Sequence, residues 1–175
     1  MLQQSSKIKK VLVFALGTAL LWAVPGTGLS KDRPFSVITM DKDAPPISLS
    51  KVDGGEFSLG DTQAKVIIIN FWATWCKVCK KEMPSLDALD KKYDDIAVVM
   101  VAGDSHKRVK KYLADKDYGF TVIIDQYGTA MKDYGVVAFP HTFIIKKGRV
   151  VGHIFGEADF TGEVATTYFD KLMVK

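Results

Sequence analysis

The stretch that decides the fold spans residues 66–84 and reads Val66-Ile67-Ile68-Ile69-Asn70-Phe71-Trp72-Ala73-Thr74-Trp75-Cys76-Lys77-Val78-Cys79-Lys80-Lys81-Glu82-Met83-Pro84. It begins with a nearly continuous apolar run, which is typical of a strand buried on both faces of a parallel sheet. A helical pattern follows it. The only two cysteines of the chain lie at the junction. We therefore expect a buried strand to deliver a Cys-x-x-Cys pair to the start of a helix.

The two cysteines of this pair are not equivalent in their predicted chemistry. A thiol attacks a disulfide as the thiolate, and the amide groups and positive dipole end at a helix N-terminus stabilise that anion. Cys76 is expected at this terminus beside the cation of Lys77, so it is the candidate attacking sulfur, with a lowered pKa. Cys79 lies three residues later on the same helix face, where it can resolve a mixed disulfide. Trp75 is expected to shield the sulfurs from water on one side.

Other uses of a Cys-x-x-Cys pair agree less well with this sequence. Half a zinc site would need further ligands, but the chain has no second cysteine pair and its three histidines are scattered, so we expect no metal. A structural disulfide across so short a loop would remove little chain entropy from the unfolded state. The pattern therefore favours a redox-active pair that works without a cofactor.

Composition and charge suggest one domain with an appendage. The chain has 175 residues, of which 47% are hydrophobic, and its formal charge is +4. Three of these charges come from Lys7, Lys9 and Lys10, which leaves about +1 for the rest of the chain. So small a charge excludes the electrostatic footprint of a nucleic-acid-binding protein.

The N-terminal residues have the pattern of an export segment. Residues 7–10 are basic, and residues 11–24 follow without a charge. We predict a signal peptide or membrane anchor over residues 1–30, a linker over 31–42 and the globular domain over 43–175. Cleavage and retention of the segment are both open. Either one places the domain in the periplasm or on the outer face of the bacterial cytoplasmic membrane, where thiols become oxidised unless something reduces them.

Hydrophobic periodicity predicts an α/β fold. Residues 47–49 and 56–59 alternate around Asp53-Gly54-Gly55 and predict a β-hairpin. Helices are expected over residues 76–93, 105–116, 128–134 and 162–173. Strands are expected over residues 66–71, 96–102, 120–124, 142–145 and 149–155. This order predicts a mixed central sheet flanked by helices.

Over about residues 43–173 the sequence resembles the exported, membrane-associated TlpA/ResA-type thiol–disulfide oxidoreductases of the thioredoxin-like fold. The resemblance rests on the stretch from Asn70 to Pro84, on Ala138-Phe139-Pro140-His141-Thr142-Phe143-Ile144-Ile145, and on Lys147-Gly148-Arg149-Val150-Val151-Gly152. It implies that Pro140 is cis and lies against the redox disulfide. The exposed backbone of Phe139 would then pair with a substrate strand next to Cys76.

The resemblance also assigns a role to Glu82, because the family has a carboxylate beneath the cysteines at this position. A partly buried Glu82 would have a raised pKa and take the proton of Cys79. Helix position alone favours a solvated glutamate, and both readings stay open. Asn70, which cannot move a proton, stands where ordinary thioredoxins place a buried aspartate, and this favours Glu82 as the proton carrier. His141 is unusual here, and it is expected either as a cation or donor near the sulfurs or as a surface residue that contacts substrate.

The preferred function is an exported reductase of protein disulfides. The resemblance implies apocytochrome c among its substrates, and its electrons would come from a membrane thiol-reducing partner. One alternative is a disulfide-forming oxidant that uses the same cysteines in the opposite direction, and a peroxidase is less favoured. Another is a copper-binding chaperone on the same fold, with His141 or His153 completing a site at the cysteines.

Overall fold

The computed structural model describes residues 35–174. The chain divides into two units, Met1–Ser30 and Lys31–Lys175. The predicted signal peptide or anchor over residues 1–30 lies outside the described residues. Within residues 35–174, no helix combines the length and the apolar character that crossing a membrane requires.

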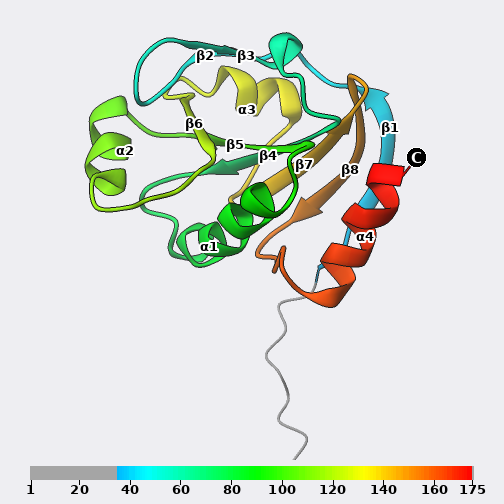
Figure 1. The fold of residues 1–175 in the computed structure, drawn as a ribbon. Helices are drawn as coiled ribbons and strands as arrows, with labels where there is room; N and C mark the ends of the chain where they lie inside the picture. Colours follow the sequence, from blue (N-terminus) through cyan, green and yellow to red (C-terminus); the bar gives the residue numbers. More distant parts are fainter. Residues whose placement is uncertain (1–34, 175) are drawn as a thin grey trace, which may run out of the picture. The chain divides into compact units, whose positions relative to one another are not determined.

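A six-stranded mixed sheet forms the centre of the domain (Figure 1). Its strand order is β1-β8-β7-β4-β5-β6. Strands β4, β5 and β6 run parallel to one another, whereas β7 is antiparallel to β4, and β8 is antiparallel to both β7 and β1. The strands span Ile38–Asp43 (β1), Val66–Trp72 (β4), Ile96–Ala102 (β5), Thr121–Ile124 (β6), His141–Lys146 (β7) and Arg149–Phe155 (β8).

Helices and a small hairpin cover the two faces of this sheet. One apolar cluster takes buried residues from α1 (Lys77–Lys92), α2 (His106–Leu113) and α4 (Glu163–Val174). The cluster on the other face takes them from α3 (Thr129–Tyr134) and from the predicted hairpin, which is present as β2 (Ser48–Ser50) and β3 (Glu56–Ser58). The short 3-10 helix η1 (Leu59–Asp61) follows β3. The expected fold of a mixed sheet between helices is therefore confirmed.

Strand β4 lies in the middle of the sheet, where both of its faces are covered, and all seven of its side chains are buried. Ile68 and Trp72 pack beneath α1, while Ile69 and Phe71 belong to the opposite core. The polar exception is Asn70, which is also fully buried. Since β4 leads directly into the loop before α1, the centre of the sheet fixes the position of the cysteine pair.

The prediction of a linker over residues 31–42 is wrong for Ile38–Lys42, because these residues belong to β1. This strand pairs antiparallel with β8 at the edge of the sheet, and Ile38 lies opposite His153. An edge strand has one free side, and none of the side chains of β1 is fully buried. Its polar composition therefore resembled that of a linker, although its backbone completes the sheet.

The hairpin protects the other edge of the sheet. Its turn lies beside β6, where the amide of Val52 donates to the carbonyl of Val122 at 2.9 Å and Lys51 forms an isolated bridge with Ile123. Covering an exposed strand in this way prevents its free backbone groups from pairing with another chain.

Candidate functional site

The two cysteines form a disulfide at the N-terminus of α1, with their Cα atoms 5.4 Å apart. Cys76 is the N-cap residue, and its Sγ accepts a hydrogen bond of 3.1 Å from the backbone amide of Cys79. The amide that would stabilise a thiolate at Cys76 is thus already directed at this sulfur. The sequence determines where the cysteines lie, because β4 ends at Trp72 and only a short loop separates it from the start of α1.

The two sulfur-bearing residues differ in their access to solvent. Cys76 is 7% exposed and Cys79 is 0% exposed. Both cysteines belong to the apolar cluster on this face of the sheet, but Cys76 keeps a small exposed fraction that Cys79 lacks. This difference in exposure has the direction expected for an attacking Cys76 and a resolving Cys79, and these two roles stay predictions.

An exposed aromatic surface lies next to Cys76. Trp75 is 68% exposed, and its ring lies 5.6 Å from that of Phe139. Phe139 fits against Gly103, where a Cβ atom would come within 2.9 Å of its ring. Trp75 thus extends into solvent beside the sulfurs and, with Phe139, offers apolar surface to a partner.

The peptide bond between Phe139 and Pro140 is cis. Pro140 is buried, and its carbonyl accepts a hydrogen bond of 3.0 Å from the amide of Gly156. Strand β7 begins at the next residue, His141, which pairs with Phe71 near the end of β4. The expected cis proline is therefore present, and it ends the loop that carries Phe139.

Glu82 lies on the buried face of α1 and has no solvent exposure. Its Oε1 accepts a hydrogen bond of 2.8 Å from Asn70 Nδ2, and its Oε2 accepts one of 3.2 Å from the amide of Ala158. Asn70 Nδ2 also donates to Thr142 Oγ1 at 2.9 Å. The sequence left open whether Glu82 is buried or solvated, and in the structure it is buried.

His141 lies on the other face of the sheet. Side chains alternate along β7, so Thr142 and Ile144 face α1, while His141 and Phe143 face the opposite core. His141 Nε2 is 2.8 Å from Nδ1 of His153. Burial, followed by His153 and Lys42, lowers the pKa of His141 to about 4. The imidazole of His141 is thus bonded to His153 on the face opposite α1, and not placed near the sulfurs as one of the expectations had it.

A buried carboxylate that the sequence analysis missed contacts the loop before Cys76. Asp104 follows β5, and its Oδ2 accepts a hydrogen bond from the hydroxyl of Thr74. Its Oδ1 accepts from the amide of Ser105 at 2.8 Å and pairs with Arg108. Burial opposes ionisation, but the bonds from Thr74, Ser105 and Arg108 outweigh it and hold the pKa of Asp104 below its usual range. No local pattern marks this residue, because Thr74 is 30 positions away.

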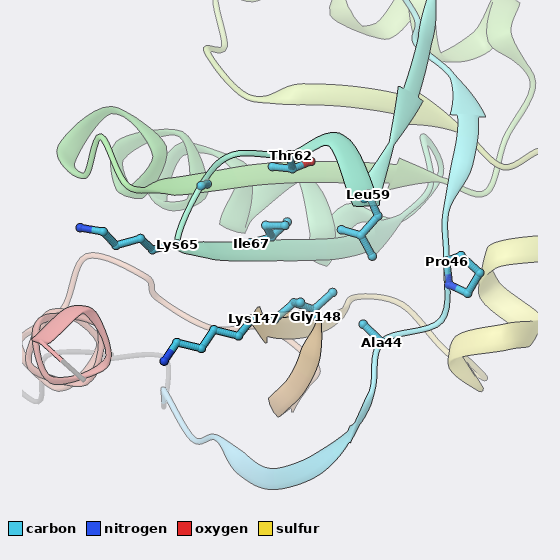
Figure 2. Close-up of a pocket in the computed structure, with 11 residues that line it drawn as sticks. Ala44, Pro46, Leu59, Thr62, Lys65, Ile67, Lys147 and Gly148 are labelled. Carbon is cyan, nitrogen blue, oxygen red and sulfur yellow. The ribbon is translucent and has the colours of Figure 1, made fainter.

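A cavity of about 340 Å³ lies elsewhere in the domain (Figure 2). Its lining includes Ile67 at the start of β4, Leu59 and Thr62 from the segment before it, and Gly148 from the β7–β8 turn. The cysteines follow the opposite end of β4, so the cavity is separate from the redox site. Among residues 35–174, no group of three or more His, Cys, Asp or Glu side chains is arranged to hold a metal ion.

Comparison with known proteins agrees with this geometry. The family model described as the AhpC/TSA family matches residues 40–154. The thiol-disulfide oxidoreductase ResA of Bacillus thuringiensis subsp. konkukian (strain 97-27) is 37% identical over 135 residues, which cover 75% of this chain and 77% of that protein. The thioredoxin-like protein YneN of Bacillus subtilis (strain 168) is 36% identical over 147 residues, covering 79% and 86% of the two chains.

Solved structures give the same assignment. The crystal structure of a thiol:disulfide interchange protein of the thioredoxin family from Chlorobium tepidum TLS superposes with a TM-score of 0.62 at 27% identity. It covers 78% of this chain and 97% of that one. The disulfide at the start of α1 and the similarity to these proteins lead to one conclusion. The chain belongs to the AhpC/TSA family and to the ResA-like thiol–disulfide oxidoreductases of the thioredoxin-like fold.

Proposed function

We propose that this thiol–disulfide oxidoreductase works as an exported reductase of protein disulfides. The observation that carries the proposal is the layered arrangement of the site. Cys76, which is 7% exposed, lies at the helix N-terminus, Cys79 is fully buried in the first turn, and Glu82 is buried further along the same helix face. Such an arrangement suits an attacking thiolate, a resolving thiol and a group that takes up its proton.

The reaction begins with the reduced protein. The Cys76 thiolate attacks one sulfur of a substrate disulfide, which forms a mixed disulfide and releases the other substrate sulfur as a thiolate that takes a proton from water. Cys79 then attacks the sulfur of Cys76, its proton passes to Glu82, and the second substrate sulfur leaves. Two electrons pass to the substrate, and the Cys76–Cys79 disulfide remains. A dithiol donor restores the reduced protein by the reverse exchange.

Substrate would dock on the surface around Cys76. Trp75 and Phe139 form an apolar contact surface, and the loop that ends at Pro140 offers its backbone to an extended segment of substrate. His141 is not included in this surface, because its imidazole bonds to His153 in the opposite core. That bond also gives no support to a copper site made from a histidine and the cysteine pair.

The N-terminal sequence supports the proposed location, which in turn bears on the partners. The basic residues 7–10 and the uncharged run over residues 11–24 support export. In an oxidising compartment a reductase needs an external source of electrons, for which we propose a membrane thiol-reducing partner. Apocytochrome c, whose cysteines must be reduced before haem attachment, is the proposed substrate among other exported proteins with disulfides.

The competing hypothesis is net oxidation by the same cysteines. The chain between Tyr93 and Phe120 folds only as β5 and α2, which leaves no place in that segment for the large helical insertion usual in disulfide-forming oxidants. The reduction potential separates the two directions. We expect a value well below the roughly −120 mV of a strong oxidant such as DsbA, and a potential near that value would overturn the proposed direction.

Capture of substrates tests the function directly. In a Cys79→Ala variant the mixed disulfide on Cys76 cannot be resolved, so substrates should accumulate as covalent adducts in cells that express the full-length chain. The matched control is the Cys76→Ala/Cys79→Ala double variant, which should capture nothing. Apocytochrome c among the adducts supports the proposed pathway. Adducts that contain only other exported proteins would instead indicate a general reductase.

A further inference from the structure

The loop that carries Cys76 is fastened to the neighbouring strand through one buried carboxylate. Strands β4 and β5 are parallel and in register at Trp72 and Ala102, so their C-terminal ends lie side by side. The amide of Gly103 donates to the carbonyl of Trp72 at 2.8 Å. Just beyond these residues, the Thr74 hydroxyl donates to Oδ2 of Asp104. The loop is therefore held by a side chain two residues before the attacking sulfur.

The charge of this carboxylate is compensated on its other oxygen. Oδ1 of Asp104 accepts from the amide of Ser105 and from Nε of Arg108, one turn along α2. The side chain of Asp104 is 1% exposed, whereas that of Arg108 is 70% exposed. A buried anion thus lies close to the cysteine loop, and a surface cation neutralises it.

We propose that Asp104 is a positioning residue for the attacking cysteine: through Thr74 it fixes the loop that places Cys76 Sγ at the N-terminus of α1, and Arg108 cancels its charge beside the thiolate. This inference rests on the proposed role of Cys76 as the attacking sulfur. Asp104 touches neither sulfur in this role. It acts only through Thr74 and through its electric field.

Two separate physical effects follow from this arrangement. Loss of the Thr74 hydroxyl frees the loop, so that Cys76 Sγ no longer keeps its place opposite the amide of Cys79, and the thiolate loses stabilisation. Loss of the Arg108 cation leaves the loop fastened but exposes the thiolate to an uncompensated negative charge, which also disfavours it. The second effect is electrostatic, so added salt weakens it, whereas the first does not depend on salt.

The fold supplies a matched control in Asp125. This carboxylate is buried like Asp104 and follows the next parallel strand, β6. It accepts hydrogen bonds from the amides of Thr129 and Met131 in α3. Among the described residues, no hydrogen bond or ion pair connects Asp125 to the loop that carries Cys76. An Asp125→Asn variant therefore tests the general cost of neutralising a buried carboxylate at a strand end.

The experiment measures the alkylation rate of Cys76 by iodoacetamide against pH in the fully reduced, full-length chain, with Cys76 and Cys79 resolved by peptide mass spectrometry. Thr74→Val should slow the reaction near neutral pH by about threefold or more, through a rise of about half a unit in the thiol pKa. Thr74→Ser should restore the wild-type profile. Arg108→Gln should also slow it, but less in about 1 M salt than in about 0.05 M.

Two control variants should keep the wild-type pH profile. Asp125→Asn should lower only the unfolding midpoint, and Lys111→Gln removes a cation of α2 that is not paired with Asp104. The inference is overturned if Thr74→Val and Arg108→Gln keep the wild-type profile, or if Asp125→Asn shifts it equally. Arg108→Gln alters an exposed side chain, so it remains a test even if Thr74→Val does not fold. If wild-type Cys76 itself titrates as an ordinary thiol and turns over no disulfide, the proposed function fails instead.

Discussion

The side-chain amide of Asn70 donates a hydrogen bond of 2.8 Å to Oε1 of Glu82, and neither side chain reaches solvent. The bond joins the central strand β4 to the helix that carries the cysteines. An amide cannot exchange a proton with the thiols, but it can fix the orientation of a neighbouring carboxyl group. In the proposed mechanism Glu82 carries the proton of Cys79, and Asn70 holds Glu82 in place.

Replacement of Glu82 by glutamine should slow resolution of the mixed disulfide. Glutamine keeps the shape of the side chain and an oxygen that accepts from Asn70, but it cannot take up a proton at the pH of the reaction. Loss of a positioned proton acceptor costs on the order of 10²-fold in rate. Single-turnover kinetics with a peptide disulfide should therefore show the mixed disulfide on Cys76 accumulating, while the initial attack by Cys76 keeps its rate.

The control for this prediction is Glu163→Gln, which changes an exposed glutamate of α4 and should leave both steps at their wild-type rates. An unchanged rate of resolution in Glu82→Gln would mean that another group receives the proton of Cys79. A decrease in the attack rate alone would indicate that Glu82 acts on Cys76 and not on Cys79.

Replacement of Asn70 by alanine should destabilise the domain. The substitution removes the donor to both Glu82 and Thr142, and it leaves buried oxygens with fewer partners, which costs about 1–3 kcal/mol. Thr142→Val removes one partner of Asn70 but keeps the bond to Glu82, so its cost should be smaller. Urea denaturation of the oxidised protein measures both. Equal losses in the two variants would contradict a special role for the Asn70–Glu82 bond.

The sequence was sufficient for the parts of the site that depend on local pattern. The nearly continuous apolar run of β4 and the Cys-x-x-Cys pair after it predicted the central strand and the helix start, and Cys76 is indeed the N-cap of α1. The cis bond before Pro140 was predicted from the family resemblance and is present. These features depend on residues that are neighbours in the chain.

Contacts between distant segments were beyond the reach of the sequence. Glu82 has Lys80 and Lys81 as neighbours, and its burial depends on Asn70 and on the amide of Ala158, which is 76 residues away. Thr74 and Asp104 meet only because β4 and β5 are adjacent and parallel. Strand β1 was missed for a different reason, since an edge strand has no apolar pattern when its side chains stay partly exposed.

Replacement of Trp75 by alanine should separate protein substrates from small ones. The exposed indole packs on Phe139 beside Cys76, so it can contact a polypeptide that docks there but is not required for the exchange itself. The catalytic efficiency with a protein disulfide should fall about tenfold, which corresponds to about 1.4 kcal/mol of lost aromatic contact. With a small aromatic disulfide such as a thiol-detection reagent, the loss should be no more than about twofold.

Tyr127→Ala is the matched control, because Tyr127 is an exposed aromatic residue in the loop between β6 and α3 and makes no ring contact with Trp75 or Phe139 among the described residues. It should leave both efficiencies unchanged. Equal losses for the protein and the small substrate in Trp75→Ala would show that the indole affects the reactivity of Cys76 and not the docking of substrate.

The paired histidines predict a loss of stability in mild acid. Burial, His153 and Lys42 lower the pKa of His141 to about 4, and burial and Lys42 lower that of His153. In the unfolded chain histidine titrates near pH 6.5, so between about pH 6.5 and 4 the unfolded state binds protons that the folded state does not. The contribution of the pair to stability is therefore complete above about pH 6.5 and is lost as the pH falls towards 4.

Replacement of His141 by glutamine tests this prediction, because glutamine can still bond to His153 but does not titrate. Urea denaturation at a series of pH values from about 7.5 to 4.5 should give a smaller loss of stability in the variant than in the wild type, by on the order of 1–3 kcal/mol. Carboxylates such as Asp104, whose pKa is held low, contribute to acid destabilisation in both proteins and cancel in the difference. If the two proteins lose the same stability between these pH values, His141 must accept its proton in the folded state as readily as in the unfolded chain, and the buried pair would have to open below neutral pH without cost.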